Sequence, residues 1–95
     1  MALTLSVLLW ALDGREADLV AYEDRVLSLL PDHDGRVVQR ARRLSADGGP
    51  YEVQTLEFAS QAALDGFTSD PRRAALASDR DAAIAQTQIS EVQLV

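Results

Sequence analysis

The strongest constraint on the fold lies in the second half of the chain, where a strand pattern, a helical segment and a second strand pattern follow one another. Residues 51–58 and 88–95 alternate in polarity, and the segment between them has helical spacing. The first half repeats this order, with apolar alternation in residues 3–10, a helical segment and a strand pattern ending at Leu44. We therefore expect a β-α-β-β-α-β order over residues 1–95, folded as a single domain.

The first helix is marked by an aspartate and a glutamate three residues apart. Asp13 and Glu16 predict a capping box, in which two side chains satisfy backbone N–H groups at the start of a helix. Apolar side chains at helical spacing continue to about Leu30, and the segment Pro31–Gly35 predicts the loop that ends the helix. The next residues, up to Leu44, carry four arginines and predict a half-exposed edge strand.

The second helical segment is predicted to be interrupted. Ser60 is a suitable N-cap for a first, short helix. The pair Asp70-Pro71 then predicts a restart, because proline is tolerated in the first turn, where its missing N–H has no partner to lose. We expect this second part to run to about Gln86 and the last strand to begin at Gln88.

Two β-α-β units of this kind predict the ferredoxin-like fold, a four-stranded antiparallel sheet with both helices on one face. One face of the strand in residues 3–10 is wholly aliphatic, which is typical of a central strand under helices. The opposite face of the sheet is predicted to carry Val53, Glu57 and Glu91 with no helix to cover it. A second copy of the chain would cover this face, so we expect a homodimer.

The composition excludes several classes of function. A net charge of −6 opposes the phosphates of nucleic acid. The chain has no cysteine and one histidine, which excludes thiolate catalysis and opposes a structural zinc site, so we expect no metal. It has no Gly-x-Gly-x-x-Gly or Walker pattern for a nucleotide, and we expect no cofactor. All nine basic residues are arginine, which excludes Schiff-base chemistry on a lysine.

The apolar N-terminal stretch, residues 1–12, has no basic residue before it and is too short to span a bilayer. It predicts a buried strand rather than a signal peptide. We therefore expect a soluble, cytoplasmic protein that does not associate with membranes.

A resemblance to a known family rests on three short patterns: Glu57-Phe58 before a serine-capped helix, the Asp70-Pro71 restart, and the alternating final strand. Together they resemble the dimeric α/β-barrel superfamily, and within it the small DUF1330-like and antibiotic-biosynthesis-monooxygenase-like proteins. The resemblance covers essentially the whole chain and implies a dimeric barrel of two ferredoxin-like subunits. It also implies an activity among the cofactor-free monooxygenases, isomerases and cyclases. Haem-handling members need a histidine on the second helix, and this chain has none there.

Two charged residues interrupt the apolar faces of the predicted helices. Glu23 lies within about 40° of Leu19 on a helical projection, and Arg80 is four residues from both Leu76 and Ile84. Since both helices cover the same sheet face, a pocket between them could hold both charges, with Arg80 binding an anionic oxygen and Glu23 acting as base. The alternatives are a structural ion pair, or two side chains that extend from the edge of the apolar stripe into solvent, and the sequence does not decide between these arrangements.

Further residues are candidates for the same pocket. Trp10 and Tyr22 would wall it with aromatic surface, or both are core residues with a polar edge. Leu76 and Ile84 would supply apolar contacts to a substrate. His33, flanked by two aspartates, would act as a general base over the pocket mouth, or is a solvated loop residue.

Two glutamates in the strands are also considered. Glu57 and Glu91 are expected on the helix-free face, either as a carboxylate pair for acid–base chemistry or paired with the arginines of the edge strand.

The function that these observations favour is a small cofactor-free enzyme acting on an apolar, oxygen-bearing small molecule, with a monooxygenase, isomerase or cyclase reaction. A shaped pocket with one or two polar groups is sufficient for such chemistry. The alternative is a non-catalytic dimeric module that binds a ligand or a partner protein. The sequence does not decide between them.

Overall fold

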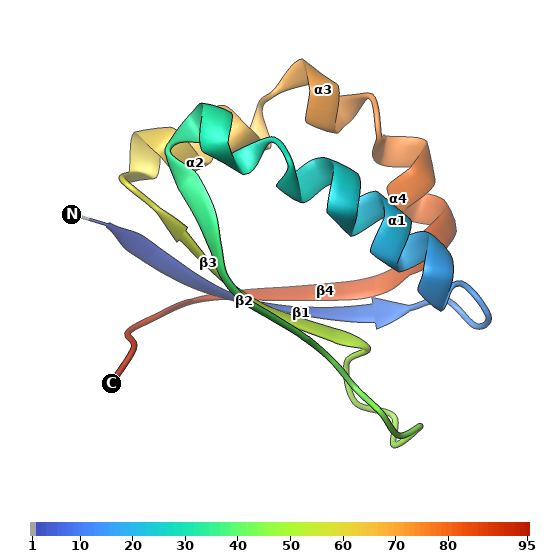
Figure 1. The fold of residues 1–95 in the computed structure, drawn as a ribbon. Helices are drawn as coiled ribbons and strands as arrows, with labels where there is room; N and C mark the ends of the chain where they lie inside the picture. The colour runs from blue at the N-terminus through green and yellow to red at the C-terminus, as the bar shows by residue number, and fades with distance from the viewer. Residues whose placement is uncertain (1) are drawn as a thin grey trace.

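The computed structural model describes residues 2–95 as one four-stranded antiparallel sheet with the helices on one face (Figure 1). The elements in chain order are β1 (Leu3–Ala11), α1 (Glu16–Leu27), the 3₁₀ turn η1 (Leu30–His33), β2 (Gly35–Arg42), β3 (Glu52–Phe58), α2 (Gln61–Thr68), α3 (Pro71–Ala74), α4 (Ala77–Ala83) and β4 (Ile84–Val92). The strand order is β2-β3-β1-β4. This is the ferredoxin-like arrangement, so the predicted fold class is confirmed.

The core lies between β1 and β3 on one side and α1 and α2 on the other. Leu5, Val7 and Leu9 of β1 are buried and face the helices, as the alternation predicted. Leu19 and Phe58, from α1 and β3, are fully buried in the same cluster. Burial of these aliphatic and aromatic side chains holds the helical layer on the sheet.

Helix α1 begins later than the predicted capping box requires. Asp13 and Gly14 form a turn in which Gly14 has a φ of 74°, a value that a residue with a Cβ rarely adopts. The N-cap position is Arg15, and no side chain caps the helix there, so the capping-box prediction is wrong. The helix also ends at Leu27, and the predicted loop that follows contains the 3₁₀ turn η1.

The second helical segment has both predicted caps. The Ser60 side chain accepts a hydrogen bond from the backbone N–H of Ala63 at 3.1 Å, and the Asp70 side chain accepts one from Arg72 at 2.8 Å. The helix after Pro71 is not continuous, however: it divides into α3 and α4. Such short helical turns are not stable alone, and α4 packs against α1 in the folded protein.

The last strand starts earlier than predicted, at Ile84, and its pairing places Ile89 opposite Val7 and Glu91 opposite Leu5. Both residues therefore share the helix-covered face of the sheet, whereas Glu57 pairs with Thr4 on the helix-free face. The prediction that Glu57 and Glu91 lie on the same face is wrong. Apolar residues occur on both faces of β4, so its alternation alone does not determine which face is buried.

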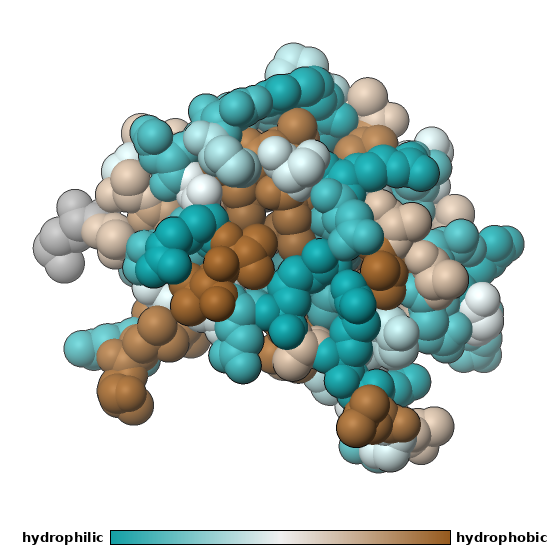
Figure 2. Space-filling view, viewed as in Figure 1, coloured by the Kyte–Doolittle hydropathy of each residue, from teal (hydrophilic) through white to brown (hydrophobic). Residues whose placement is uncertain are grey.

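The sheet has two open edges, β2 and β4, and the predicted edge position of the arginine-rich strand is confirmed. Figure 2 shows polar side chains over much of the surface, with hydrophobic side chains visible between the helical layer and the sheet. Within residues 2–95, no helix is long and apolar enough to cross a membrane.

Candidate functional site

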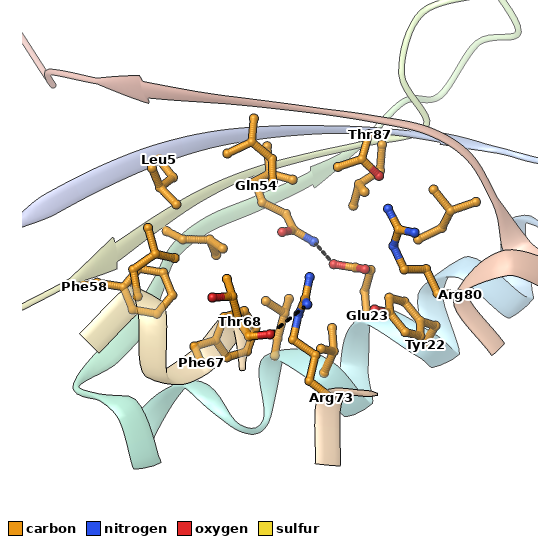
Figure 3. Close-up of a pocket in the computed structure, with 18 residues that line it drawn as sticks. Leu5, Tyr22, Glu23, Gln54, Phe58, Phe67, Thr68, Arg73, Arg80 and Thr87 are labelled. Atoms are coloured by element: carbon orange, nitrogen blue, oxygen red, sulfur yellow. Dashed lines mark hydrogen bonds between the residues drawn. The ribbon is translucent and has the colours of Figure 1, made fainter. Parts of the chain in front are cut away.

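A pocket of about 110 Å³ lies between the helices and the sheet, and we call it the Glu23 pocket. Most of its wall is apolar and comes from β1, β3, α1 and α2. The polar side chains that line it are Tyr22, Glu23, Gln54, Thr68, Arg73, Arg80 and Thr87 (Figure 3). Such a surface, mainly hydrophobic with a few converging polar groups, is typical of a small-molecule site.

Glu23 lies on the buried face of α1, with only 5% of its surface exposed. Its Oε1 atom accepts a hydrogen bond from Nε2 of Gln54 at 2.6 Å. None of the residues in 2–95 forms a hydrogen bond or ion pair with its Oε2 atom. Burial raises the pKa of Glu23, and the negative charge of Glu52 adds to this effect, while the Gln54 hydrogen bond opposes it.

Gln54 connects Glu23 to a second carboxylate. Its Nε2 atom also donates to Glu52 at 2.6 Å, and Glu52 is bound by Arg40 and Arg42, each at 3.0 Å. Burial by itself would raise the pKa of Glu52, but hydrogen bonds from Arg40, Gln54 and Arg42 lower it below its ordinary value. The result is a chain of hydrogen bonds from the arginines of β2 through β3 to the pocket.

Our sequence analysis did not identify Glu52 or Gln54. Both were within the predicted strand, and the large apolar residues Leu56 and Phe58 share their alternation. If Leu56 and Phe58 are taken to define the buried face of this strand, then Glu52 and Gln54 must be buried as well. Two buried polar side chains on one strand indicate a network of hydrogen bonds.

Arg80 lines the pocket, but its side chain remains 44% exposed, and its ion pair with Asp81 is long, at 3.8 Å. It forms no ion pair with Glu23 among the described residues, so the two predicted charges share a pocket without closing on each other. In the view of Figure 3, Arg73 and Arg80 flank the Glu23 carboxylate. Arg73, which our sequence analysis missed, lies over the Phe67 ring at 5.4 Å.

These two arginines differ from most others in the chain. The remaining arginines, apart from Arg43, each lie within 3.2 Å of a carboxylate oxygen. Within residues 2–95, the Arg73 guanidinium forms a single hydrogen bond, a long one of 3.4 Å to the backbone oxygen of Thr68. Two guanidinium groups without close carboxylates are therefore available at the pocket.

Of the other predicted substrate-binding residues, Tyr22 and Ile84 also line the Glu23 pocket. Tyr22 is buried, and burial, together with the charge of Glu23, raises the pKa of its hydroxyl. It also borders a second, more polar hollow of about 180 Å³ between α1 and α4. The second hollow is lined by exposed ion pairs, whereas the Glu23 pocket contains a buried carboxylate. The Glu23 pocket is therefore the better candidate for chemistry.

Trp10, Leu76 and His33 do not line the pocket. Trp10 lies on the helix-free face of β1, where its Nε1 donates to the backbone oxygen of Gly48 at 3.2 Å. Leu76 packs against the core from outside the pocket. The proposed positions of Trp10 and Leu76 in a pocket wall are therefore wrong.

His33 is neither over the pocket mouth nor a solvated loop residue. It is partly buried, and its Nε2 atom lies 2.7 Å from Oδ2 of Asp70. Its ring meets the edge of Phe67, which lines the pocket, with centroids 6.2 Å apart. His33 thus supports the pocket wall from behind. No group of three or more histidine, aspartate or glutamate side chains within residues 2–95 is placed to hold a metal ion.

No model of a known protein family matches the chain, and no curated protein matches it in sequence. Solved structures do share its fold. A protein of unknown function from Rhodopseudomonas palustris is 17% identical with a TM-score of 0.78, covering 99% of this chain and 82% of that one. A dabb-family protein with a ferredoxin-like fold from Mesorhizobium loti is 14% identical, with a TM-score of 0.71 and coverage of 99% and 97%.

A further similar structure is a dimeric ferredoxin-like protein of unknown function from Thermobifida fusca. It is 16% identical, with a TM-score of 0.72, covering 99% of this chain and 92% of that one. The chain therefore shares the ferredoxin-like fold with these structures. At these identities the likeness establishes the fold, and the chemistry of the pocket has to be argued from its residues.

Proposed function

We propose that the protein is a homodimeric, cofactor-free enzyme that binds a small, largely apolar molecule with a carbonyl oxygen in the Glu23 pocket and moves a proton to or from one of its carbon atoms. One observation carries the proposal. A carboxylate in an apolar pocket has one oxygen held by Gln54, and its other oxygen has no protein partner among residues 2–95. A general base needs such a free oxygen, within reach of the substrate.

The chemistry follows from the neighbours of Glu23. Its Oε2 atom removes a proton from the carbon next to the carbonyl, and the electron pair of the broken C–H bond moves onto the carbonyl oxygen. The guanidinium groups of Arg73 and Arg80 offset the negative charge that develops there. Where the enolate is conjugated with a carbon–carbon double bond, return of the proton from Glu23 to a different carbon completes an isomerisation. In a cyclisation, the enolate carbon attacks a second carbonyl of the same molecule, and the oxygen of that carbonyl takes up the proton from Glu23. Cofactor-free oxygenation, which the family resemblance implies, would begin with the same proton removal.

The size of the pocket limits the substrate. An engineered cavity of about 150 Å³ holds benzene, so the Glu23 pocket, at about 110 Å³, encloses a group of similar or smaller size. Three of the residues that line it, Thr68, Arg80 and Ile89, are exposed, so the pocket reaches the surface. A larger substrate would place its reacting end beside Glu23 and leave the rest outside.

The dimer proposal rests on the helix-free face of the sheet. Leu8, Trp10 and Val53 lie there with no helix above them, and Val53 is 37% exposed. A second sheet packed on this face would remove apolar side chains from water. Two of the similar structures, from Bacteroides fragilis and Thermobifida fusca, are described as dimeric.

The proposal is tested by hydrogen exchange on a simple ketone. Cyclopentanone in D₂O exchanges the hydrogens next to its carbonyl when a base removes them, and NMR follows the exchange. We expect the wild-type protein to accelerate this exchange and Glu23→Gln to abolish the acceleration. The matched control is Glu57→Gln, which removes a carboxylate from the opposite face of the same sheet. Equal acceleration by all three proteins would contradict the assignment to Glu23.

The small volume of the pocket also favours a second candidate, a non-catalytic module that binds a small ligand. Chemical-shift changes at the pocket residues on addition of cyclopentanone, without any exchange, would support this module over the enzyme. If a panel of small ketones causes no chemical-shift changes and shows no accelerated hydrogen exchange, both candidate functions of this pocket are contradicted.

A further inference from the structure

We propose that Gln54 is the positioning residue of this site: its amide holds the Glu23 carboxylate by one oxygen, presents the other oxygen to the pocket, and is itself held in place by the ion-paired Glu52. The inference rests on the proposed role of Glu23 as the proton-transferring group. It concerns how a buried carboxylate on a helix is held and oriented.

The first step is the geometry of the amide. Nε2 of Gln54 lies 2.6 Å from Oε1 of Glu23 and 2.6 Å from Oε2 of Glu52. An amide nitrogen carries two hydrogens, and each points at a different carboxylate. Gln54 itself is only 1% exposed, so water does not compete for these hydrogens.

The second step concerns the orientation of this amide. The nitrogen and oxygen ends of a glutamine have almost the same shape, and only the hydrogen-bond network distinguishes them. Between two carboxylates, an amide oxygen would face two other acceptors and repel both. The nitrogen must therefore occupy this position, and the Gln54 oxygen is directed away from both carboxylates.

The third step is the anchor. Glu52 is completely buried, and its two oxygens are bound by Arg40 at 3.0 and 3.2 Å and by Arg42 at 3.0 Å. Arg40 is held in turn by Asp24 of α1 at 2.8 Å. Two guanidinium groups keep Glu52 charged, so it accepts from Gln54 throughout the neutral pH range. The position of the amide is thus set from the side away from the pocket.

The fourth step links this support to the chemistry. A hydrogen bond from a neutral donor favours the charged form of a carboxylate, whereas burial favours the neutral form. The other titratable or charged groups around Glu23 are Tyr22, Arg40, Glu52, Arg73 and Arg80. None of these donates a hydrogen bond to Glu23 in the described structure, so Gln54 is the group that stabilises its ionised form by direct contact.

The inference is tested by NMR with glutamate labelled with ¹³C at the carboxyl carbon, which reports the ionisation of Glu23 without any ligand. Gln54→Met keeps the length and approximate volume of the side chain and removes both donors. We expect the midpoint of the Glu23 titration to move to higher pH, with on the order of a tenfold loss in its acid dissociation constant. The control Glu57→Gln, on the other face, should leave the midpoint unchanged.

A second measurement uses the wild-type protein and does not depend on the folding of a variant. The two Nε2 hydrogens of Gln54 should exchange slowly with water, and their NMR signals should shift as Glu23 takes up its proton. Fast exchange with water, signals that do not respond to the Glu23 titration, or an unchanged Glu23 midpoint in a folded Gln54→Met protein would overturn the inference. Because neither measurement involves a substrate, a failure here is distinct from a failure of the ketone-exchange test.

Discussion

The Oδ2 atom of Asp70 lies 2.7 Å from Nε2 of His33, and this contact joins η1 to the start of α3. The same carboxylate accepts from the backbone N–H of Arg72 at 2.8 Å and binds its guanidinium at 2.8 Å. The hydrogen bonds from Arg72 and His33 hold the pKa of Asp70 well below its usual range. Asp70 therefore connects η1 to the first turn of α3, behind the Phe67 wall of the pocket.

Asp70→Asn should destabilise the protein in a pH-dependent way. Asparagine still caps a helix, so the variant loses mainly the charge. Because the folded-state pKa is depressed, the stabilisation by the charge is present above the unfolded value of about 3.9 and is lost as the pH falls below it. The Tm difference between wild type and variant should therefore shrink as thermal unfolding is followed from about pH 6 down to about pH 2.5. Asp65→Asn, an exposed carboxyl on α2, is the control, and a difference independent of pH would contradict the assignment.

Glu23→Gln should stabilise the protein at neutral pH. Burial raises the pKa of Glu23, so its ionised form costs stability above that pKa, and the cost fades as the pH falls toward about 4.3, the ordinary value for glutamate. We expect a gain on the order of 1 kcal/mol at about pH 7.5 and little difference at about pH 4.5, measured by urea unfolding. A Glu23→Gln protein that is less stable than the wild type at about pH 7.5, but equally stable at about pH 4.5, would contradict this prediction, because it would show that the charge of Glu23 stabilises the fold.

Glu52→Ala should be strongly destabilising. The substitution leaves Arg40 without its buried partner, and the loss of one member of a buried ion pair costs about 3–5 kcal/mol. Arg42→Ala should destabilise the protein less than Glu52→Ala does. The Arg42 side chain is 42% exposed, against 23% for Arg40, so water can replace part of its contact with Glu52. The urea midpoints of the two variants provide the comparison, and equal losses would contradict the buried position of Glu52.

The proposed dimer predicts that the helix-free face is the interface. The wild-type protein should sediment with twice the mass of the chain at micromolar concentration. Val53→Arg should shift the equilibrium to monomer, because it places a charge on the apolar part of this face. A dimer that persists in Val53→Arg would place the interface elsewhere. Trp10, on the same face, offers a fluorescence signal for the dissociation.

The two pocket arginines should affect activity without a large effect on stability. We expect Arg73→Gln and Arg80→Gln each to slow the ketone exchange on the order of tenfold, because each removes one positive charge beside the developing oxyanion. Arg36→Gln, which removes an arginine that is paired with Glu57 on the helix-free face, is the control. If the rate of ketone exchange is unchanged in both Arg73→Gln and Arg80→Gln, the two arginines only line the pocket and do not take part in the reaction.

The fold could be predicted from the sequence because the patterns that indicate it are local. The alternation of Leu5, Val7 and Leu9, the serine cap at Ser60 and the Asp70 cap depend on residues close together in the sequence. The same locality explains the errors. The apolar residues of β4 do not fall on one face, so the face of Glu91 depended on which residue of β1 it paired with, and that pairing is a long-range contact.

The candidate site could be predicted only in part, because some of its contacts join residues that are far apart in the sequence. The sequence by itself determined that Glu23 lies on the buried stripe of a helix, because helical periodicity places it beside Leu19. Only the tertiary structure decided what that burial means. Gln54 lies 31 residues away and meets Glu23 across the core, whereas Trp10 was turned to the other face. A buried carboxylate is a pocket group or half of an ion pair according to the partner that folding brings within hydrogen-bond distance, and that partner comes from a distant strand.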